Sequence, residues 1–267
     1  MEIATTARPL TVWVVSDGRA GIENQALGLA EAIQRLTPAT LTVKRIRWRP
    51  RADRLPVFLK TPALLDPSSD SVTPVPGEAW PDLWIATGRA TLPLSLAARR
   101  RSGGRTFVVQ TQDPRLSPAR FDMVVAPAHD ELAGDNVFRI TGSPHRITPG
   151  RIVAAAAEMA DRIAPLPQPR VAVLIGGRSA AFDLTEAHAA DLADRIARAI
   201  RAAGGSLLLT FSRRTPAAAR AVMVDRLGHL PGIIWDERGP NPYFAFLGAA
   251  DHVLVTEDSA NMAAEAA

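Results

Sequence analysis

The sequence predicts an α/β protein built from two domains of repeated strand–helix units. First, short apolar runs alternate with longer amphipathic stretches along nearly the whole chain. Second, each half opens with a strand, a glycine turn and a helix: Leu10–Val15 leads into Gly18, and Val171–Ile175 leads into Gly176-Gly177. Third, prolines crowd residues 165–169. A helix cannot continue through them, so they predict a stiff linker between residues 1–164 and residues 170–267.

The first domain is expected to hold a parallel sheet with helices on both faces. Its predicted strands are Leu10–Val15, Leu41–Ile46, Asp82–Thr87, Thr106–Gln110, Phe121–Ala126 and Val137–Thr141, and its helices are Glu23–Leu36, Leu92–Arg101 and Pro149–Ile163. Between them, Arg47–Gly77 is rich in Pro, Arg and Ser and predicts a long excursion with short helices.

The second domain repeats the pattern and ends in an Ala-rich helix. Its predicted strands are Val171–Ile175, Ser206–Phe211, Ile233–Trp235 and His252–Thr256, and its helices are Thr185–Ala203, Pro216–Leu227, Pro242–Leu247 and one starting at Ser259. The last helix has no glycine cap and no strand after it. We therefore expect a second domain that is incomplete, its last elements missing.

Composition excludes several classes of site. The chain has 267 residues, a net charge of +4, no cysteine and five histidines without metal-ligand spacing, so neither a metal nor another cofactor is expected. Arg99–Arg101 is typical of a solvated helix end rather than a nucleic-acid site. No apolar run reaches the roughly 18 residues of a membrane span. We expect a soluble cytoplasmic protein, and peripheral membrane contact stays open.

The Gly176-Gly177 corner predicts an anion site. Glycine lets a ligand approach the backbone, and free amides near a helix start attract phosphate. The alternative is a tight turn that binds nothing. Arg178 follows directly in the same turn, and further candidates for this side of the ligand follow later strands: Ser212, Arg213, Arg214, Asp258, Ser259 and Glu265.

Candidate residues for the other side of the ligand, polar side chains and two glycines, follow the strands of the first domain, where ligands meet parallel sheets. They are Asp17, Gly18, Arg19, Gly21, Asn24, Gln25, Arg89, Gln112 and Asp113. Asp17 is the first candidate for a general base and Asp113 the second. The alternatives are that Asp17 bonds only its own turn and that Asn24 only satisfies free amides at the helix start.

Several segments, in order, resemble bacterial members of the ELM (elongated mitochondria) family. They are SDGRAGIENQALGLAEAI, IATGRATLPLSLAARRRSGGRTFVVQTQDPR, GDNVFRITGSPHRITP, LIGGRSAAFDLT, LTFSRRTP and VTEDSANMAAEA. The resemblance implies two Rossmann-like domains facing across a cleft, the GT-B architecture of nucleotide-sugar glycosyltransferases. The label nucleoside-diphosphate-sugar epimerase, often given to such proteins, lacks support here: no GxxGxxG opens the chain, and Tyr243 is the single tyrosine and is not in a YxxxK pair.

The glucosaminyltransferase that makes lipid II is a more distant likeness. By that resemblance Gly176, Gly177 and Ser179 would cradle a diphosphate, Arg146 would neutralise it, and Glu265 would hold the ribose. The histidine of that enzyme's first loop has no counterpart between Gly18 and Gly21. The implied reaction is metal-independent transfer of a sugar from a nucleoside diphosphate to an unidentified acceptor. The alternatives are a non-catalytic GT-B-like scaffold or ligand-binding protein and, third, an epimerase.

Overall fold

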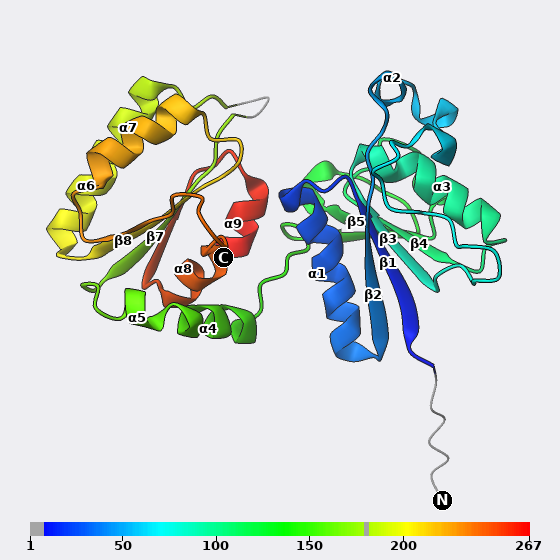
Figure 1. Cartoon of the computed structure of the whole chain (residues 1–267), viewed down its shortest axis with the longest axis horizontal. Coiled ribbons are helices and arrows are strands. Elements are labelled where there is room, and N and C mark those ends of the chain that lie inside the picture. The colour runs from blue at the N-terminus through cyan, green and yellow to red at the C-terminus, as the bar shows by residue number, and fades with distance from the viewer. Residues whose placement is uncertain (1–7, 179–181) are drawn as a thin grey trace, which may run out of the picture. The chain divides into compact units, whose positions relative to one another are not determined.

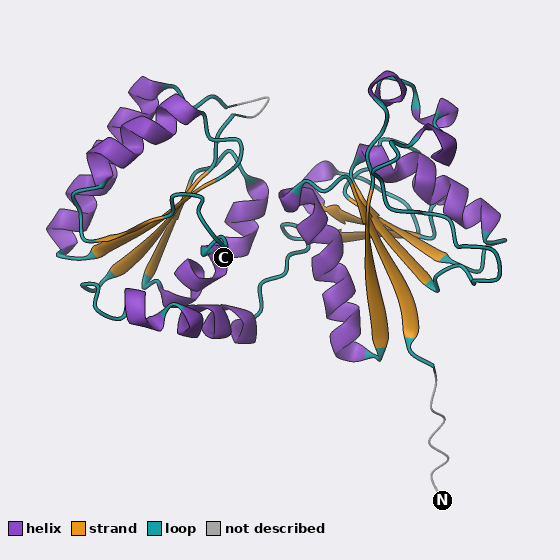
Figure 2. Cartoon of the chain, in the orientation of Figure 1, coloured by secondary structure: helices purple, strands orange, loops and turns teal. Residues whose placement is uncertain are grey.

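The computed structural model describes residues 8–178 and 182–267. The chain divides into two units, Met1–Arg146 and Ile147–Ala267, and each has its own parallel sheet (Figure 1). Helices cover both faces of each sheet, so each unit has three layers (Figure 2). The α/β class and the repeated strand–helix order that we predicted are thus confirmed.

Six parallel strands form the sheet of the first unit, in the order β2-β1-β3-β4-β5-β6. Their bounds are β1 (Leu10–Ser16), β2 (Ala39–Arg45), β3 (Leu83–Thr87), β4 (Phe107–Thr111), β5 (Met123–Pro127) and β6 (Val137–Ile140). Helix α1 (Ala20–Leu36) packs on the face that carries Val12 and Val14. Helix α3 (Leu92–Arg101) covers the opposite face, around Trp84. Burial on both faces explains why these strands are apolar throughout.

The excursion after β2 contains only short helices, as predicted. They are α2 (Pro50–Asp53) and the 3-10 turns η1 (Val57–Leu59) and η2 (Pro62–Leu64). Outside the excursion, the later loops of this unit contain the 3-10 turns η3 (Arg89–Thr91), η4 (Pro118–Arg120) and η5 (Ala128–Asp130). Trp48 fixes the excursion to the body of the unit: its indole is buried and donates a 2.9 Å hydrogen bond to the carbonyl of Ala90. A bridge between Trp48 and Leu65 closes the segment on itself.

The second unit has a four-stranded parallel sheet in the order β10-β7-β8-β9. The strands are β7 (Arg170–Ile175), β8 (Ser206–Phe211), β9 (Gly232–Ile234) and β10 (His252–Val255), and the helices are α4 (Pro149–Glu158), α5 (Ala160–Ile163), α6 (Glu186–Ala203), α7 (Ala217–Leu227), α8 (Tyr243–Ala249) and α9 (Ala260–Ala266). Helices α6 and α7 cover one face. On the other face, Ile163 and Phe246 pack against Ala172 and Leu208.

The two compact units divide between Arg146 and Ile147, before α4, whereas the sequence predicted a linker at residues 165–169. The predicted helix Pro149–Ile163 is two helices, α4 and α5, and both belong to the second unit. Gly248 of α8 approaches α4 so closely that a Cβ there would collide with the carbonyl of Ile152. The prolines do end α5, but its apolar face joins the second core, so they lead into β7 rather than between domains.

None of the helices among the described residues is long and apolar enough to cross a membrane.

Candidate functional site

Each sheet has one point where the strand order reverses. In the first sheet this point lies between β1 and β3, and in the second it lies between β7 and β10. Loops that leave two such neighbouring strands run to opposite faces, which leaves room for ligands at the carboxyl ends. The Asp17 loop and Gly88 follow β1 and β3, whereas the Gly176 turn and Asp258 follow β7 and β10.

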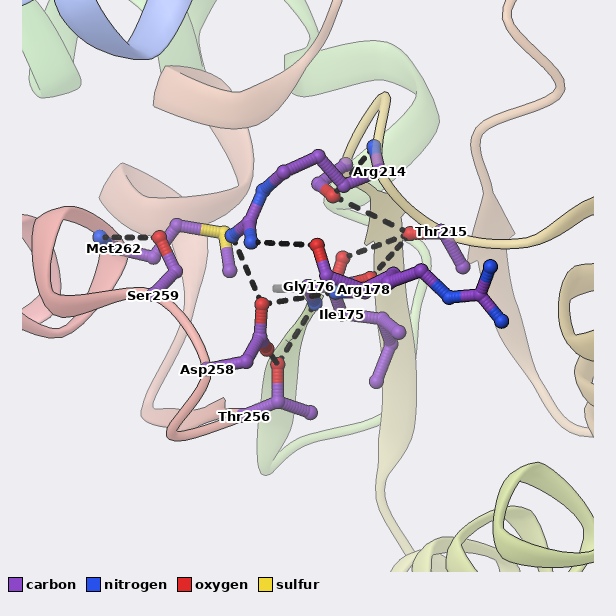
Figure 3. Close-up of polar contacts among 11 residues, drawn as sticks. Ile175, Gly176, Arg178, Arg214, Thr215, Thr256, Asp258, Ser259 and Met262 are labelled. Carbon is purple, nitrogen blue, oxygen red and sulfur yellow. Dashed lines mark hydrogen bonds and ion pairs between the residues drawn. The ribbon is translucent and has the colours of Figure 1, made fainter. Parts of the chain in front are cut away.

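The amides of the Gly176 turn already have partners, which corrects the expectation that they are free. Gly176 N donates to Thr256 Oγ1 at 2.7 Å, and Gly177 N donates to Asp258 Oδ2 at 2.9 Å. Thr256 Oγ1 in turn donates to Asp258 Oδ1 at 2.7 Å. Figure 3 shows the Asp258 carboxylate beside the turn, close to the amides that we had assigned to a diphosphate. The turn therefore holds an anion that the chain itself supplies.

Arg214 completes this site from the loop after β8. Its Nη2 atom is 2.9 Å from Asp258 Oδ2, and only 7% of the Asp258 side chain is exposed. Its Nη1 atom donates to the carbonyl of Arg178, and Arg178 N donates back to the carbonyl of Arg214 (Figure 3). Three strand-end loops are thus tied together around one carboxylate, which receives an amide and a guanidinium as a bound anion would.

Close packing, rather than an unusual backbone angle, explains both glycines. A Cβ on Gly176 would collide with the carboxylate of Asp258, and one on Gly177 would collide with the backbone of Arg214 and Thr215. The Thr215 hydroxyl adds a hydrogen bond to the carbonyl of Gly176. The close approach that glycine permits here is made by the chain's own residues.

The remaining candidates of this edge have different surroundings. Arg178 is exposed and pairs with Asp183 at 3.1 Å, which raises the pKa of Arg178 and lowers that of Asp183. Ser212 accepts a 3.1 Å hydrogen bond from Arg214 N. Arg213 is exposed and has no hydrogen bond or ion pair with any residue of the described ranges. Ser179 lies outside the described residues.

Ser259 and Glu265, the candidates in and before α9, both have partners inside the second unit. Ser259 caps α9 and accepts a 3.4 Å hydrogen bond from Met262 N, as its sequence position suggested. Glu265 Oε2 accepts a 2.7 Å hydrogen bond from the Tyr243 hydroxyl. Burial, and then the charge of Glu265, raise the pKa of Tyr243 well above its usual value. The ribose role of Glu265 stays a prediction, and its carboxylate has a tyrosine partner.

In the first unit Asp17 forms the turn that was its structural alternative. Its Oδ1 accepts from Arg19 N at 3.2 Å, and its Oδ2 lies 2.6 Å from Arg19 Nη2. Gly18 has a positive φ of 76°, a conformation that favours glycine. Asp17 raises the pKa of Arg19, which also lies near Gly88 across the reversal point. The structure thus brings the first two strand ends together, with Asp17 already paired.

Asp113 has a similar arrangement on the loop after β4. Its Oδ1 accepts from Arg115 N at 2.7 Å, and its Oδ2 lies 3.0 Å from Arg115 Nε. Gln112 takes a positive φ of 68°, and Arg89 is exposed after β3. Gly21, Asn24 and Gln25 all lie in the first turns of α1, where Gln25 is buried and Asn24 is half-buried. Both proposed bases are therefore held by an arginine two residues later.

Arg146 is bound within the first unit. Its Nε atom donates to Glu31 Oε1 of α1 at 2.9 Å. The adjacent backbone touches the same helix, because a Cβ on Gly28 would collide with the carbonyl of His145. Its assignment to a diphosphate stays a prediction, and Glu31 competes for the guanidinium.

Sequence reasoning missed a buried carboxylate beside the first reversal point. Glu23 of α1 accepts a 2.6 Å hydrogen bond from Ser16, and its two oxygens accept from Arg45 at 2.9 Å each. The hydrogen bonds from Arg45 lower the pKa of Glu23 despite its burial. Arg45 is the last residue of β2, which pairs with β1, and it lay inside the predicted strand Leu41–Ile46, so no sequence signal set it apart.

Among the residues that the structure describes, acidic and histidine side chains do not gather into a cation site. Within residues 8–178 and 182–267, no three His, Asp or Glu side chains are placed so that they could hold a metal ion.

Comparison with known families points to one group of proteins. The family model described as Mitochondrial fission ELM1 matches residues 20–267. The chain is similar to Mitochondrial fission protein ELM1 of Arabidopsis thaliana, with 33% identity over 210 residues, which are 70% of this chain and 49% of that protein. It thus spans about half the length of that relative. An uncharacterized protein of Rickettsia prowazekii is 25% identical over 97% of this chain and 80% of its own.

The fold is similar to that of solved UDP-GlcNAc 2-epimerases. The enzyme from Neisseria meningitidis, bound to UDP-GlcNAc, matches with a TM-score of 0.53 and 13% identity over 95% of this chain and 79% of that chain. The enzyme from Methanocaldococcus jannaschii matches with a TM-score of 0.51 and 13% identity over 96% of this chain and 81% of its own. At such identity the likeness shows the fold alone, which is GT-B-like.

Proposed function

The chain belongs to the mitochondrial fission ELM1 family, and from that premise we propose that it binds a nucleoside diphosphate sugar at the Gly176 turn and transfers the sugar to an acceptor. The GT-B-like fold supports this proposal, because two solved proteins that share the fold are named for UDP-GlcNAc. UDP-GlcNAc is therefore the first ligand to test.

One observation carries the proposal: the turn at the second reversal point already stabilises a negative charge. Asp258 is nearly buried there, and it is held by Gly177 N, the Thr256 hydroxyl and Arg214. An amide and a guanidinium are also the donors that stabilise a diphosphate, including one that leaves during transfer.

A diphosphate would compete with Asp258 for these donors. Placing both anions on one amide and one guanidinium would cost much free energy. Like charges at hydrogen-bond range repel strongly in a partly buried site. We infer that the carboxylate turns away when the ligand binds. Arg213 lies beside Arg214, and it adds a cation that is not committed to any described carboxylate.

The acceptor side is assigned to the first unit, with Asp17 as the proposed base and Asp113 second. A carboxylate that acts as the base must exchange its arginine partner for the acceptor hydroxyl. For Asp17 this means exchanging the guanidinium of Arg19 for the substrate, while the backbone bond from Arg19 N keeps the carboxylate in place.

A second candidate function is nucleotide-sugar binding without catalysis. The pairing of both proposed bases with arginines favours it, because each carboxylate already has a structural partner in its own turn. In that case the protein would be a ligand-binding scaffold.

Calorimetry with UDP-GlcNAc and UDP tests the binding step. We expect micromolar to millimolar affinity that Arg213→Ala lowers at least about fivefold. The control is Arg195→Ala, which removes an exposed arginine of α6 that forms only a long ion pair, 3.9 Å, with Asp191. Unchanged binding in Arg213→Ala would contradict this site.

Product analysis with UDP-GlcNAc then separates the candidate activities. Release of UDP on addition of an acceptor supports transfer, and its loss in Asp17→Asn supports the proposed base. Tight binding with no turnover across an acceptor panel supports the scaffold. Conversion of the sugar while the nucleotide stays attached would identify an epimerase.

A further inference from the structure

The first part of the excursion after β2, residues 47–60, carries a concentrated positive charge. Between residues 47 and 60 five basic residues stand against one acidic residue, Asp53, so this short stretch has as much net charge as the entire chain. The four arginines of this stretch are all exposed: Arg47, Arg49, Arg51 and Arg54. Asp66 lies near two of them, because its pKa is lowered first by hydrogen bonds from Ser68 and then by the charges of Arg47 and Arg49. Arg51 and Arg54 are therefore the arginines whose charges the test below changes. The one lysine, Lys60, has a largely buried side chain and lies 3.6 Å from Asp53, which offsets the single negative charge.

Apolar side chains are exposed among these arginines. Phe58 is 80% exposed, Leu59 51% and Leu55 37%. Scattered exposed apolar residues need no explanation, but here three lie within five positions of one short folded segment. We call the exposed side chains of Arg47, Arg49, Arg51, Arg54, Leu55, Phe58 and Leu59 the basic apolar patch.

Buried residues anchor the segment that carries the patch. Trp48 and Ala52 are buried, and Val57 packs against the core of the unit next to Phe58. The Lys60 ammonium lies 5.2 Å from the centre of the Trp48 ring and donates to the carbonyl of Asp53 at 2.9 Å. Figure 1 shows α2 beyond the body of the first unit, on the side where the β-strands end. The side chains are therefore presented outward by a folded segment.

We propose that the basic apolar patch docks this protein on a membrane surface rich in anionic lipids. Exposed arginines attract anionic headgroups, and one aromatic and two leucine side chains reach the boundary with the acyl chains. Nucleic acid would match the arginines but would leave the two leucines without a role. The inference is independent of nucleotide binding at the Gly176 turn.

Vesicle sedimentation with the full chain tests the proposal. We expect binding to vesicles of phosphatidylcholine with phosphatidylglycerol, little binding to phosphatidylcholine alone, and weakening by salt. The double variant Phe58→Ser, Leu59→Ser should lower the partition coefficient by about tenfold or more. Its control is Phe138→Ser, which removes an equally apolar side chain that is 61% exposed on β6.

A second pair of variants tests the charge. Arg51→Glu with Arg54→Glu should abolish binding, whereas Arg100→Glu with Arg101→Glu changes the charge equally at the exposed end of α3 and should lower binding far less. Unchanged melting temperatures exclude misfolding as the cause.

Three results would overturn the proposal. One is the absence of binding to anionic vesicles, and another is an equal loss in patch and control variants. The third is vesicle binding that ignores Phe58 and Leu59 while Arg51 and Arg54 are needed to bind a polynucleotide, which would assign the patch to nucleic acid.

Discussion

The carboxylate of Asp258 lies against the α-carbon of Gly176, so closely that no side chain fits between them (Figure 3). Asp258 belongs to the loop after β10, and Gly176 to the turn after β7. The contact joins two neighbouring strand ends. An external anion at this turn would therefore compete with the Asp258 carboxylate for the same donors.

Asp258→Asn should strengthen nucleoside diphosphate binding by about three- to tenfold. An amide keeps a hydrogen-bond acceptor for Gly177 N but removes the charge that competes with phosphate and holds Arg214. Calorimetry with UDP measures the change. Asp183→Asn, which frees Arg178 at an exposed ion pair, should have a smaller effect. Weaker binding in Asp258→Asn would show that the carboxylate only supports the turn.

Gly176→Ala should destabilise the second unit by about 2–4 kcal/mol, because the new methyl group meets a carboxylate that is fixed by three partners. Urea unfolding of the full chain, followed by circular dichroism, measures this. Gly150→Ala in α4 is the matched control, since a Cβ there meets nothing within 4 Å. A change at Gly176 no larger than that at Gly150 would contradict the observed packing.

The single tyrosine should resist ionisation while the protein is folded. Burial and the nearby Glu265 carboxylate raise the pKa of Tyr243, so folding favours its neutral form. This contribution is complete below the ordinary tyrosine pKa of about 10, and it is lost as the pH rises toward the folded pKa. The tyrosinate absorbance should therefore appear only with alkaline unfolding. In Glu265→Gln the absorbance should appear at lower pH, and a normal titration in the folded parent would refute the arrangement.

Glu23 should make the first unit sensitive to acid. Its pKa is lowered chiefly by the hydrogen bonds from Arg45, so its contribution is present above the unfolded pKa of about 4.3 and is lost as the pH falls through the folded pKa. Glu23→Gln should cost about 1–2 kcal/mol at pH 7, a value kept low because Arg45 is 62% exposed. Urea unfolding at pH 7 and at pH 3 should show this difference shrinking in acid. A difference independent of pH would mean that packing, rather than charge, explains the loss.

Local signals predicted the order of the elements well. Apolar runs such as Val171–Ile175 identified buried strands, and Thr185 was expected as a helix cap. It does cap α6, by accepting a hydrogen bond from His188 N at 3.2 Å. These features depend on residues a few positions apart, which a sequence shows directly.

The occupancy of the candidate site could not be predicted in this way. Gly177 and Asp258 are 81 positions apart, and they meet only because β10 pairs with β7. The division of the two compact units differs from the predicted linker for a similar reason: prolines reveal where a helix stops, but not which core its apolar face joins. Asp17 took the structural alternative that its sequence left open, a bond to its own turn.

The anchoring of Arg146 by Glu31 has a consequence for how the two units are connected. Thr148, two residues later, caps α4 by accepting a hydrogen bond from Arg151 N. The backbone between these two fixed points is little more than Ile147. The connecting backbone is therefore one residue long, which makes Ile147, and not the prolines before β7, the position where a glycine or proline substitution would change the freedom of that connection.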